Sequence, residues 1–561
     1  MKKIISMILC LMLVLSLATT AFAAETTYQY EVYQIFTGDF SDGVLSNVKW
    51  GQNGKLEDTV IEPGDDVDSD TLDALEAVDP DASWETKLAV ILQYADLTPA
   101  NAFKTVTGTG KTLTIDNLPN GYYLVKDVAG SLNGVYEEAY TTYIVEVVDG
   151  EMTISRKDSV PSVEKDIMDP SAVKENEASI GETINYQITG SLPTNIDDYD
   201  TYYYVFTDTL SEGLTYTNNM QVTVNGKNVT DYFYKNVTVN EDGTTRIVVG
   251  IPDLLALELI KEDLDSETEG VQTVGDITNQ SNVVLTYTAV LNENAVVGAP
   301  GNPNKVDLEY SNDPNNDGEG AINPPEKPDD DDEMPEPDDD QPTGKTPEVE
   351  VVTYTTELTI KKTDEDGKIL TGAAFKITGK GVYSVVVTAE RYEVATENGT
   401  HWLLKDGTYT DDEPNDDTKD EYADVNTKYV LKTVVETQTK TQDMDVNAYV
   451  GEDGTVKFTG LGAGKYTITE TATPAGYNSI APFDVEIVWN GGDSWTYIGT
   501  DEVEVEGETV NINQVTVVNQ AGSTLPETGG IGTTLFYVFG TIMVLGAAVL
   551  LITKKRMSIA E

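Results

Sequence analysis

Short stretches in which apolar and polar residues alternate recur along most of this chain, separated by Gly, Asn and Asp. Two examples are YEVYQI at 30–35 and TTYIVEV at 141–147. Side chains two positions apart share one face of a strand, so the alternation predicts sheets with one apolar face. Short helices are expected only near 84–95 and 252–263. We therefore expect an all-β chain whose sheets pack in pairs as β-sandwiches.

The composition excludes several classes of site. The 561 residues include one Cys and one His, too few for a disulfide scaffold, a Cys/His zinc site or a choice of catalytic histidines. The formal charge of -62 opposes nucleic-acid binding, because that binding requires Lys and Arg to displace counterions from phosphates. A hydrophobic content of 39% with 30 Tyr exceeds that of acidic disordered chains, so most of the chain should fold.

The first 23 residues have the features of a secretory signal peptide. Lys2 and Lys3 precede the apolar run ILCLMLVLSLA, and the small residues of AFA predict cleavage after Ala23. The only Cys, Cys10, lies inside this run. A lipoprotein is disfavoured because about a dozen further signal residues follow that Cys. The exported protein therefore contains no thiol.

A second apolar segment lies near the C-terminus. Residues 531–553 are 23 in number, enough to span a bilayer of about 30 Å as a transmembrane helix. The tail at 554–561 begins with Lys554, Lys555 and Arg556, and positive charge in this position keeps a tail in the cytoplasm. These two features alone predict an ordinary membrane anchor.

The pentapeptide just before this span favours a more specific interpretation. It consists of Leu525, Pro526, Glu527, Thr528 and Gly529. Pentapeptide, span and basic tail in this order resemble the LPXTG cell-wall sorting signal of Gram-positive surface proteins. The resemblance implies that a sortase cleaves between Thr528 and Gly529, holds Thr528 as a thioester and transfers it to an amine.

Three segments of strand character lie between the two ends, at 24–160, 161–320 and 350–522, and we expect a β-sandwich in each. The intervening residues 321–349 form an acidic loop or linker, whose part 323–342 contains six Pro and ten Asp or Glu. Such a segment repels itself and cannot bury a core, so it is expected to be extended and solvated. Calcium binding is the alternative, but the ligand spacing of an EF-hand is absent and no metal site is predicted.

Strand parity places ionisable side chains among the apolar residues of two of these domains. In the third domain they are Lys362, Glu470 and Asn519, and in the second they are Lys165, Asp208 and Asn312. Each set has a lysine on the first strand, a carboxylic acid in the middle and an asparagine on the last strand. The simpler interpretation is a buried ion pair with a hydrogen-bonding Asn, or a lysine that extends to solvent at the end of its strand.

The repetition of this order favours a chemical role. Burial lowers the pKa of a lysine and raises that of a carboxylic acid, so both groups can be neutral. The neutral amine can then attack the Asn carboxamide carbon while the acid polarises the oxygen and transfers protons, and ammonia leaves. The products would be isopeptide bonds Lys165–Asn312 and Lys362–Asn519, promoted by Asp208 and Glu470. This is single-turnover autocatalysis that needs no cofactor, so the chain is not expected to be an enzyme.

The pattern resembles the isopeptide-forming domains of Gram-positive fimbrial proteins, specifically SpaA-type major (backbone) pilins. The third domain resembles a collagen-adhesin B-type (CNA-B) module with an immunoglobulin-like sandwich. The motifs that carry this likeness are KTD at 362–364, GAAF at 372–375, YTITE at 466–470, PAGY at 474–477 and VVN at 517–519. In the middle domain they are TDTL at 207–210 and YSN at 310–312. By parity Lys361, the neighbour of Lys362, points outward.

The first domain resembles the N-terminal domain of these pilins through YQIFTG at 33–38 and LPNGYYLV at 118–125. No isopeptide bond is predicted there, because Asp127 lacks an inward lysine and a terminal Asn to match it. The resemblance implies a pilin-motif lysine at the end of this domain, and Lys157 fits by position. Ser155 and Arg156 replace the Tyr and Pro of that motif, and Asp158 replaces its Asn. A solvated surface lysine is the alternative.

We therefore expect an exported, cell wall-anchored subunit of an extracellular pilus. A class C sortase would join Thr528 to Lys157 of the next identical subunit. A housekeeping sortase would attach the polymer to peptidoglycan, and minor or tip pilins and a host receptor are further expected partners. The alternative function is a monomeric LPXTG-anchored adhesin with an isopeptide-stabilised stalk. A secreted enzyme is disfavoured, because His401 lies in a polar loop and no acid pair is positioned for glycoside hydrolysis.

Overall fold

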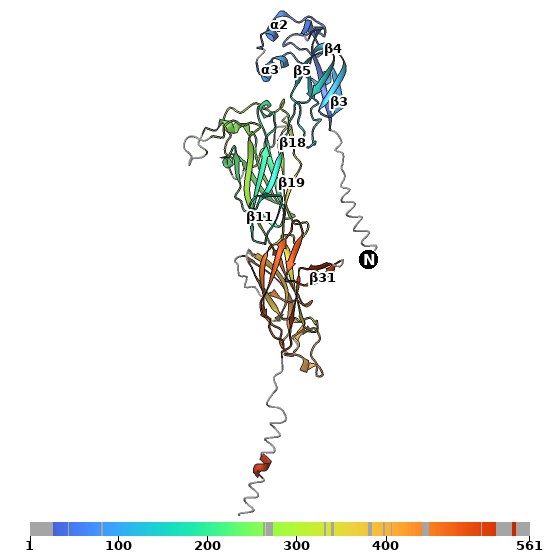
Figure 1. Ribbon diagram of the computed structural model, residues 1–561. Helices are drawn as coiled ribbons and strands as arrows, with labels where there is room; N and C mark the ends of the chain where they lie inside the picture. The colour runs from blue at the N-terminus through green and yellow to red at the C-terminus, as the bar shows by residue number, and fades with distance from the viewer. Residues whose placement is uncertain are drawn as a thin grey trace, which may run out of the picture.

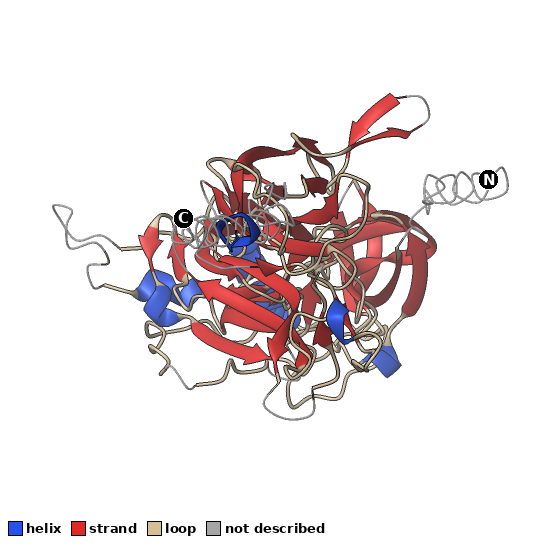
Figure 2. Cartoon of the chain, turned by 90° about the horizontal axis from the view of Figure 1, so that it is seen from below, coloured by secondary structure: helices blue, strands red, loops and turns tan. Residues whose placement is uncertain are grey.

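The computed structural model describes most of the chain between the two ends. The described residues are 26–42, 44–79, 82–261, 264, 273–329, 332–337, 341–379, 384–395, 399–405, 407–439, 448–505, 508–522 and 541–545. They form three bodies arranged along one axis, with the first at one end and the third at the other (Figure 1). Viewed along that axis, the strands of the three bodies overlap (Figure 2). The prediction of a mostly β chain with several domains is confirmed.

The first body contains one five-stranded sheet in the order β2-β1-β4-β5, with β3 paired to β1. Its strands are β1 (Thr27–Ser41), β2 (Val44–Trp50), β3 (Lys104–Thr109), β4 (Thr112–Asp127) and β5 (Ile144–Ser155). Its helices are α2 (Ser69–Glu76), α3 (Trp84–Leu92) and the 3-10 turn η1 (Pro99–Asn101). The helix α3 was expected, whereas α2, which begins after the N-cap Asp68, was not.

The first body is therefore not the predicted sandwich of two sheets. Strand β1 is buried without interruption from Tyr30 to Phe36, so both of its faces are covered. One face packs with residues of α2 and α3 such as Leu72 and Ile91. The other face packs against the loop that contains Leu132. Alternation in single strands cannot show whether a helix or a second sheet covers a face.

The middle body consists of two seven-stranded sheets that enclose one apolar core. The first sheet contains β14 (Tyr234–Val239), β15 (Thr245–Ile251), β10 (Tyr204–Leu210), β17 (Asn302–Ser311), β19 (Val349–Tyr354) and β8 (Glu175–Glu177), with β18 (Thr343–Lys345) paired to β17. The second contains β13 (Lys227–Asn228), β12 (Gln221–Val224), β16 (Asn282–Leu291), β9 (Thr183–Ser191), β6 (Val163–Met168) and β7 (Ala172–Val173), with β11 (Leu214–Tyr216) paired to β16.

Three short 3-10 helices connect strands of this body: η2 (Ile196–Asp198), η3 (Thr230–Tyr232) and η4 (Leu255–Leu259). The helix expected at 252–263 is thus a five-residue 3-10 turn.

The acidic segment lies beside the middle body and does not separate it from the third. Strands β18 and β19, which follow the segment, both pair with β17, so this sheet continues through Tyr354. Two residues of the segment contact Asn236 of β14. The Asn236 side-chain amide donates to the Asp332 carbonyl at 2.8 Å, and its side-chain oxygen accepts from the Met334 amide at 2.9 Å. No cluster of three or more acidic, Cys or His side chains suited to a metal occurs in the described part of the chain.

The third body consists of two five-stranded sheets around a second core. One contains β25 (Tyr429–Thr439), β22 (Ser384–Val394), β27 (Thr455–Leu461), β20 (Thr356–Asp364) and β33 (Gln514–Asn519). The other contains β26 (Ala448–Tyr449), β21 (Ala374–Gly379), β28 (Gly464–Ala472), β29 (Phe483–Trp489) and β30 (Trp495–Ile498). The remaining elements are β23 (Trp402–Leu403), β24 (Tyr409–Thr410), η5 (Lys419–Glu421), β31 (Glu502–Val505) and β32 (Glu508–Asn511).

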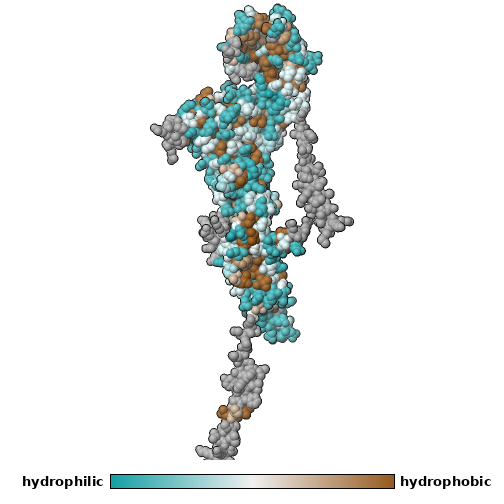
Figure 3. All heavy atoms as spheres, in the orientation of Figure 1, coloured by the Kyte–Doolittle hydropathy of each residue, from teal (hydrophilic) through white to brown (hydrophobic). Residues whose placement is uncertain are grey.

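Hydrogen bonds donated by backbone amides join successive bodies. The Tyr140 amide of the first donates to the Asn312 carbonyl of the middle body at 2.7 Å. At the other junction the Ile180 amide donates to Gly460 of the third body at 3.0 Å, and the Ala463 amide donates to the Glu177 carboxylate at 2.7 Å. The visible face of the middle body is largely hydrophilic (Figure 3). This surface suits a solvated extracellular rod.

The predicted segments at the two ends lie largely outside the described residues. This applies to the signal peptide 1–23 with Ala23, the pentapeptide 525–529 and the basic tail 554–561. Of the span predicted at 531–553, only 541–545 is described, and it is helical. Within the described part of the chain, no helix has the length and apolarity needed to cross a membrane.

Candidate functional site

The core of the middle body contains a lysine paired with a carboxylic acid. Lys165 on β6 and Asp208 on β10 come from opposite sheets, and both are buried. The Lys165 Nζ lies 2.5 Å from Asp208 Oδ2. The inward parity of both residues therefore brings them into direct contact across the sandwich.

Tyr287 on β16 completes this contact and was not singled out from the sequence. Its hydroxyl accepts a hydrogen bond from Lys165 Nζ at 3.1 Å and donates one to Asp208 Oδ2 at 2.7 Å. It also accepts a hydrogen bond from the side-chain amide of Asn304 at 2.7 Å. Tyr287 shares the inward parity of Val283 and Leu285, which is the only signal that its sequence offered.

Asn304, not the predicted Asn312, is the asparagine that belongs to this cluster. On β17, Val306 lies opposite Asp208 and Asn304 lies opposite Leu210. Asn312 follows β17 six positions beyond Val306, which corresponds to about 20 Å along an extended strand. Asn304 is fully buried, and its side-chain oxygen Oδ1 has no hydrogen bond within the described structure. The structure therefore does not bring Asn312 to Lys165.

The environment of this cluster favours neutral groups. Burial lowers the pKa of Lys165 to about 8, although Asp208 opposes the shift. Burial also raises the pKa of Asp208, against the opposing effect of Lys165. Because both shifts disfavour charge, transfer of a proton from the ammonium to the carboxylate becomes easier than in water. The amine that results can act as a nucleophile.

The third body positions a second buried lysine beside its last strand. Strands β20 and β33 pair in parallel, with Lys362 opposite Val517 and Asp364 opposite Asn519. Lys362 and Asn519 are both completely buried. The Lys362 Nζ donates to the carbonyls of Thr363 and Val517, each at 3.1 Å. The lysine and the asparagine are therefore diagonal neighbours on one inward face, and Lys361 lies on the other face.

Glu470 reaches this pair from β28 in the facing sheet. The Asn519 side-chain amide donates to its carboxylate oxygens at 3.0 and 3.3 Å. The same carboxylate accepts from the Ile480 amide at 3.1 Å, which fixes its position. Burial lowers the pKa of Lys362 to about 8, against the opposing effects of Glu470 and Asp364. This site therefore also holds a lysine that loses its proton readily.

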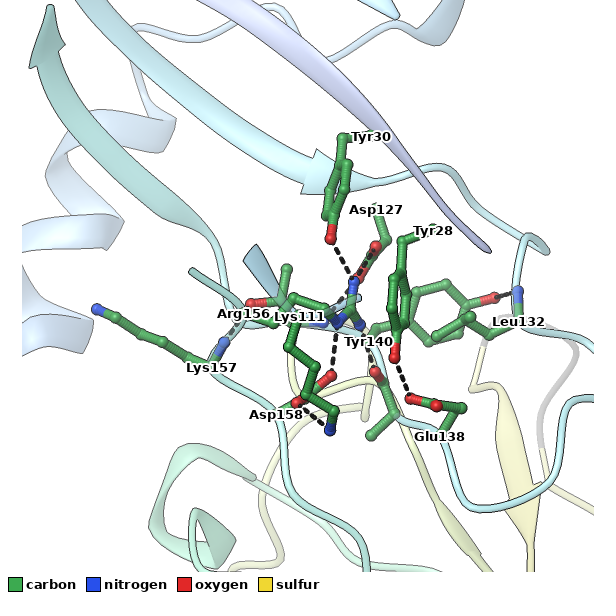
Figure 4. Close-up of polar contacts among 12 residues, drawn as sticks. Tyr28, Tyr30, Lys111, Asp127, Leu132, Glu138, Tyr140, Arg156, Lys157 and Asp158 are labelled. Atoms are coloured by element: carbon green, nitrogen blue, oxygen red, sulfur yellow. Dashed lines mark hydrogen bonds and ion pairs between the residues drawn. The ribbon is translucent and has the colours of Figure 1, made fainter. Parts of the chain in front are cut away.

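The first body also contains a buried cation, the arginine Arg156, which directly follows its last strand β5. Arg156 donates to Asp127 Oδ1 and to Asp158 Oδ2, each at 2.6 Å, and its guanidinium lies 3.9 Å from the centre of the Tyr28 ring (Figure 4). Its side chain is completely shielded from solvent, and both carboxylates are 1% exposed. Arg stays protonated in proteins and is not a nucleophile. Asp127 therefore pairs with a permanent cation.

This cluster anchors the backbone that presents Lys157. The Lys157 amide donates to the Thr141 hydroxyl at 2.8 Å, while its side chain is exposed and extends away from the cluster (Figure 4). The adjacent Asp158 is held by Arg156 and by Lys111, whose Nζ lies 2.9 Å away. The replacement of Tyr-Pro by Ser155-Arg156 thus places a fixed anchor next to an exposed lysine.

The chain leaves the third body at the tip opposite the first body. The Gly522 amide donates to the Gly476 carbonyl at 2.8 Å, and the Ala521 amide donates to Glu365 at 3.2 Å. Thr528 lies six residues beyond Gly522, outside the described part of the chain. Six extended residues span at most about 20 Å.

Three family models match the chain. They are a prealbumin-like fold domain named SpaA at residues 356–501, the Cna-B-like domain of Gram-positive pilin backbone subunit 2 at 180–314, and the LPXTG cell wall anchor motif at 517–558. The trypsin-resistant surface T6 protein of Streptococcus pyogenes serotype M6 is 26% identical over 414 residues, which cover 71% of this chain and 70% of that protein.

The chain also aligns with solved pilin structures. The T6 backbone pilin of serotype M6 Streptococcus pyogenes aligns with 16% identity and a TM-score of 0.43, over 89% of this chain and 97% of that one. The major pilin SpaA of Corynebacterium diphtheriae aligns with 14% identity and a TM-score of 0.36, over 89% of this chain and 95% of that one.

Removal of the buried arginine should destabilise the first body. Arg156→Ala leaves the buried Asp127 without its cation and Asp158 with Lys111 alone, and breaking a buried ion pair in this way costs about 3–5 kcal/mol. Hydrogen exchange of β1 and β4 measures this effect. The control is Arg246→Ala, which removes an exposed arginine of the middle body. Equal protection of β1 and β4 in the two variants would contradict a structural role for Arg156.

The free amine of Lys362 should make stability depend on pH when no crosslink can form, as in Asn519→Ala. The pKa of this lysine is about 8 in the folded protein and about 10.4 in an unfolded chain. The unfolded state then binds more protons between these values, so the free energy of unfolding should rise with pH across this interval. Denaturant titrations at several pH values, compared between Asn519→Ala and the double variant Lys362→Met/Asn519→Ala, isolate the contribution of the lysine to the free energy of unfolding. Parallel pH profiles for the two variants would refute the lowered pKa.

Proposed function

Because this chain is a Gram-positive backbone pilin with Cna-B-like and prealbumin-like domains and an LPXTG cell wall anchor, we propose that it forms a pilus shaft as a covalent polymer. A class C sortase joins Thr528 of one subunit to Lys157 of the next, and two domains carry internal Lys–Asn isopeptide bonds. The observation that carries this proposal is the burial of a lysine with a lowered pKa beside an acid and an asparagine in two separate domains.

In the middle domain the proposed bond joins Lys165 to Asn304. The neutral amine attacks the carboxamide carbon, a new N–C bond forms, and the amide nitrogen leaves as ammonia with the proton that the amine gives up. Asp208 lies in contact with the nucleophile and accepts that proton. Lys165 and Asn304 belong to facing sheets, so this bond ties the two layers of the sandwich together.

In the third domain the proposed bond joins Lys362 to Asn519. Glu470 already contacts the Asn519 amide, so it can protonate the leaving nitrogen directly. Strands β20 and β33 are the first and last of this domain. A bond between them bypasses all of the chain in between, so that pulling on the two ends of the domain does not unravel it.

Polymerisation requires an accessible amine, and Lys157 supplies one at the end of the first domain. The Arg156 cluster and Thr141 hold its backbone while its side chain extends outward. In the proposed reaction its amine attacks the thioester carbonyl of Thr528, an amide bond replaces the thioester bond, and the sortase thiolate leaves. A housekeeping sortase then transfers the last subunit to peptidoglycan. Minor or tip pilins and a host receptor are partners of the same proposal.

Substitution of the proposed acceptor should stop polymerisation. Co-expression with a class C sortase is expected to give a ladder on a denaturing gel that is lost in Lys157→Ala, because no amine remains to accept Thr528. Lys55→Ala, which removes another exposed lysine of the first domain, is the control. A ladder that persists in Lys157→Ala would place the linkage on another residue, and its absence in the wild type would favour the monomeric adhesin.

The internal bonds should be visible in the intact mass. Each releases one ammonia, about 17 Da, so the wild-type protein should be lighter than its sequence by two such losses. After correction for the substitution itself, Asn304→Ala should retain one loss and Asn312→Ala should retain both. The reverse result would restore the Asn312 assignment, and a wild-type mass equal to that of the sequence would refute both bonds.

A further inference from the structure

The two proposed crosslinking sites differ in how the acid reaches the amide. In the third domain the Asn519 amide donates directly to Glu470 at 3.0 Å. In the middle domain Asp208 Oδ2 contacts Lys165 and Tyr287, and Asp208 Oδ1 has no hydrogen bond within the described structure. The Asn304 amide nitrogen donates to Tyr287 instead. An amide nitrogen must gain a proton before it can leave as ammonia, so the middle domain needs a group to carry that proton from Asp208.

The Tyr287 hydroxyl is in position to be that group. It touches the nucleophile at 3.1 Å, the acid at 2.7 Å and the amide nitrogen at 2.7 Å. Each distance lies within the range of a hydrogen bond along which a proton can move. A hydroxyl both accepts and donates, so it can take a proton on one side and release its own on the other.

We propose that Tyr287 is a catalytic residue of the middle-domain crosslink, which relays a proton from Asp208 to the departing nitrogen of Asn304. This inference rests on the proposed Lys165–Asn304 bond. It assigns to the middle domain a four-residue site of lysine, acid, tyrosine and asparagine, whereas the third domain works with three.

The steps balance as follows. The Lys165 ammonium first gives one proton to the Asp208 carboxylate, so that both groups are neutral. The neutral amine attacks Asn304 Cγ, and protonated Asp208 donates to the Tyr287 oxygen while the Tyr287 proton moves to Asn304 Nδ2. The Cγ–Nδ2 bond breaks, ammonia leaves, and the Asp208 carboxylate takes the surplus proton of the new amide nitrogen, so Asp208 ends protonated and Tyr287 ends as it began. One N–C bond forms and one breaks, and no oxidant or other reactant is needed.

The surroundings of Tyr287 suit a relay by a neutral hydroxyl. Burial raises the pKa of Tyr287 well above its ordinary value, so the hydroxyl keeps its proton at physiological pH. The Tyr186 ring stacks on Tyr287 with centroids 5.2 Å apart, and the Tyr216 ring packs edge-on at 5.6 Å. These two rings hold the orientation of Tyr287. A phenylalanine in its place would keep both contacts and lose only the hydroxyl.

Tyr287→Phe in the full-length chain tests the relay. The protein is produced in a cell-free translation pulse, and the loss of ammonia from each domain is followed over time by mass spectrometry of the crosslinked peptides. General acid–base groups contribute about 100-fold or more to rates, so the middle-domain bond should form at least that much more slowly, while the third-domain bond forms at the wild-type rate. The control is Tyr202→Phe, which removes a buried hydroxyl of the same core that has no hydrogen bond within the described structure.

Two further measurements separate catalysis from folding. Asn304→Ala also lacks the bond but keeps the Tyr287 hydroxyl, so equal hydrogen-exchange protection of β6 and β10 in it and in Tyr287→Phe would show that the latter is folded. If Tyr287→Phe does not fold, 3,5-difluorotyrosine at position 287 keeps the hydroxyl and makes it more acidic. The relay requires a protonated hydroxyl, so the bond-formation rate of this variant should begin to fall at a lower pH than that of the wild-type protein, and an unchanged profile would refute the relay.

The outcomes distinguish this inference from the proposed function. A wild-type rate of middle-domain bond formation in folded Tyr287→Phe would overturn the role of Tyr287 and leave the Lys165–Asn304 bond intact. The absence of that bond from the wild-type protein would overturn both. A slow middle-domain bond beside a normal third-domain bond would support the relay.

Discussion

The removal of a lysine amine from water is the constraint on which the middle and third domains depend. In both, a lysine near the start of the domain is buried between two sheets, where a charged amine is costly. The middle domain offsets this cost with Asp208 and Tyr287, and the third with backbone carbonyls and the nearby Glu470. The proposed crosslink would remove the charge permanently, because an amide nitrogen would replace the ammonium. The same burial that destabilises the uncrosslinked fold would thus favour the proposed reaction.

The position of each proposed crosslink would determine how tension passes along a shaft. In the third domain a Lys362–Asn519 bond bypasses nearly the entire fold. In the middle domain a Lys165–Asn304 bond bypasses residues 166–303, but residues 305–354 remain in the path. The pairing of β19 with β17 and with β8 holds this remainder in place. Asn312 has a different role here, because its carbonyl accepts the Tyr140 amide at the junction with the first domain. In the first domain, for which no crosslink is proposed, Arg156 forms buried ion pairs with Asp127 and Asp158.

Much of this arrangement follows from the sequence, and the remainder depends on tertiary pairing. Parity along single strands placed Lys165, Asp208, Lys362 and Asn519 inward, and all four are buried. Parity could not choose between Asn304 and Asn312, because Asn312 continues the inward parity of Asn304 just beyond the end of β17 and only the register with β10 separates them. It also could not single out Tyr287, which resembles any other core tyrosine until its three hydrogen bonds are seen. The helix α2, which covers part of one face of the first sheet, was not predicted, because alternation along a strand does not show which element covers its face.

A crystal structure of the mature protein at a resolution that separates bonded from non-bonded atoms tests the central claim most directly. We predict continuous density between Lys165 Nζ and Asn304 Cγ and between Lys362 Nζ and Asn519 Cγ, with the length of an amide bond, about 1.33 Å. Separate lysine and asparagine side chains at van der Waals distance in both domains, in protein that has matured fully, would contradict this account.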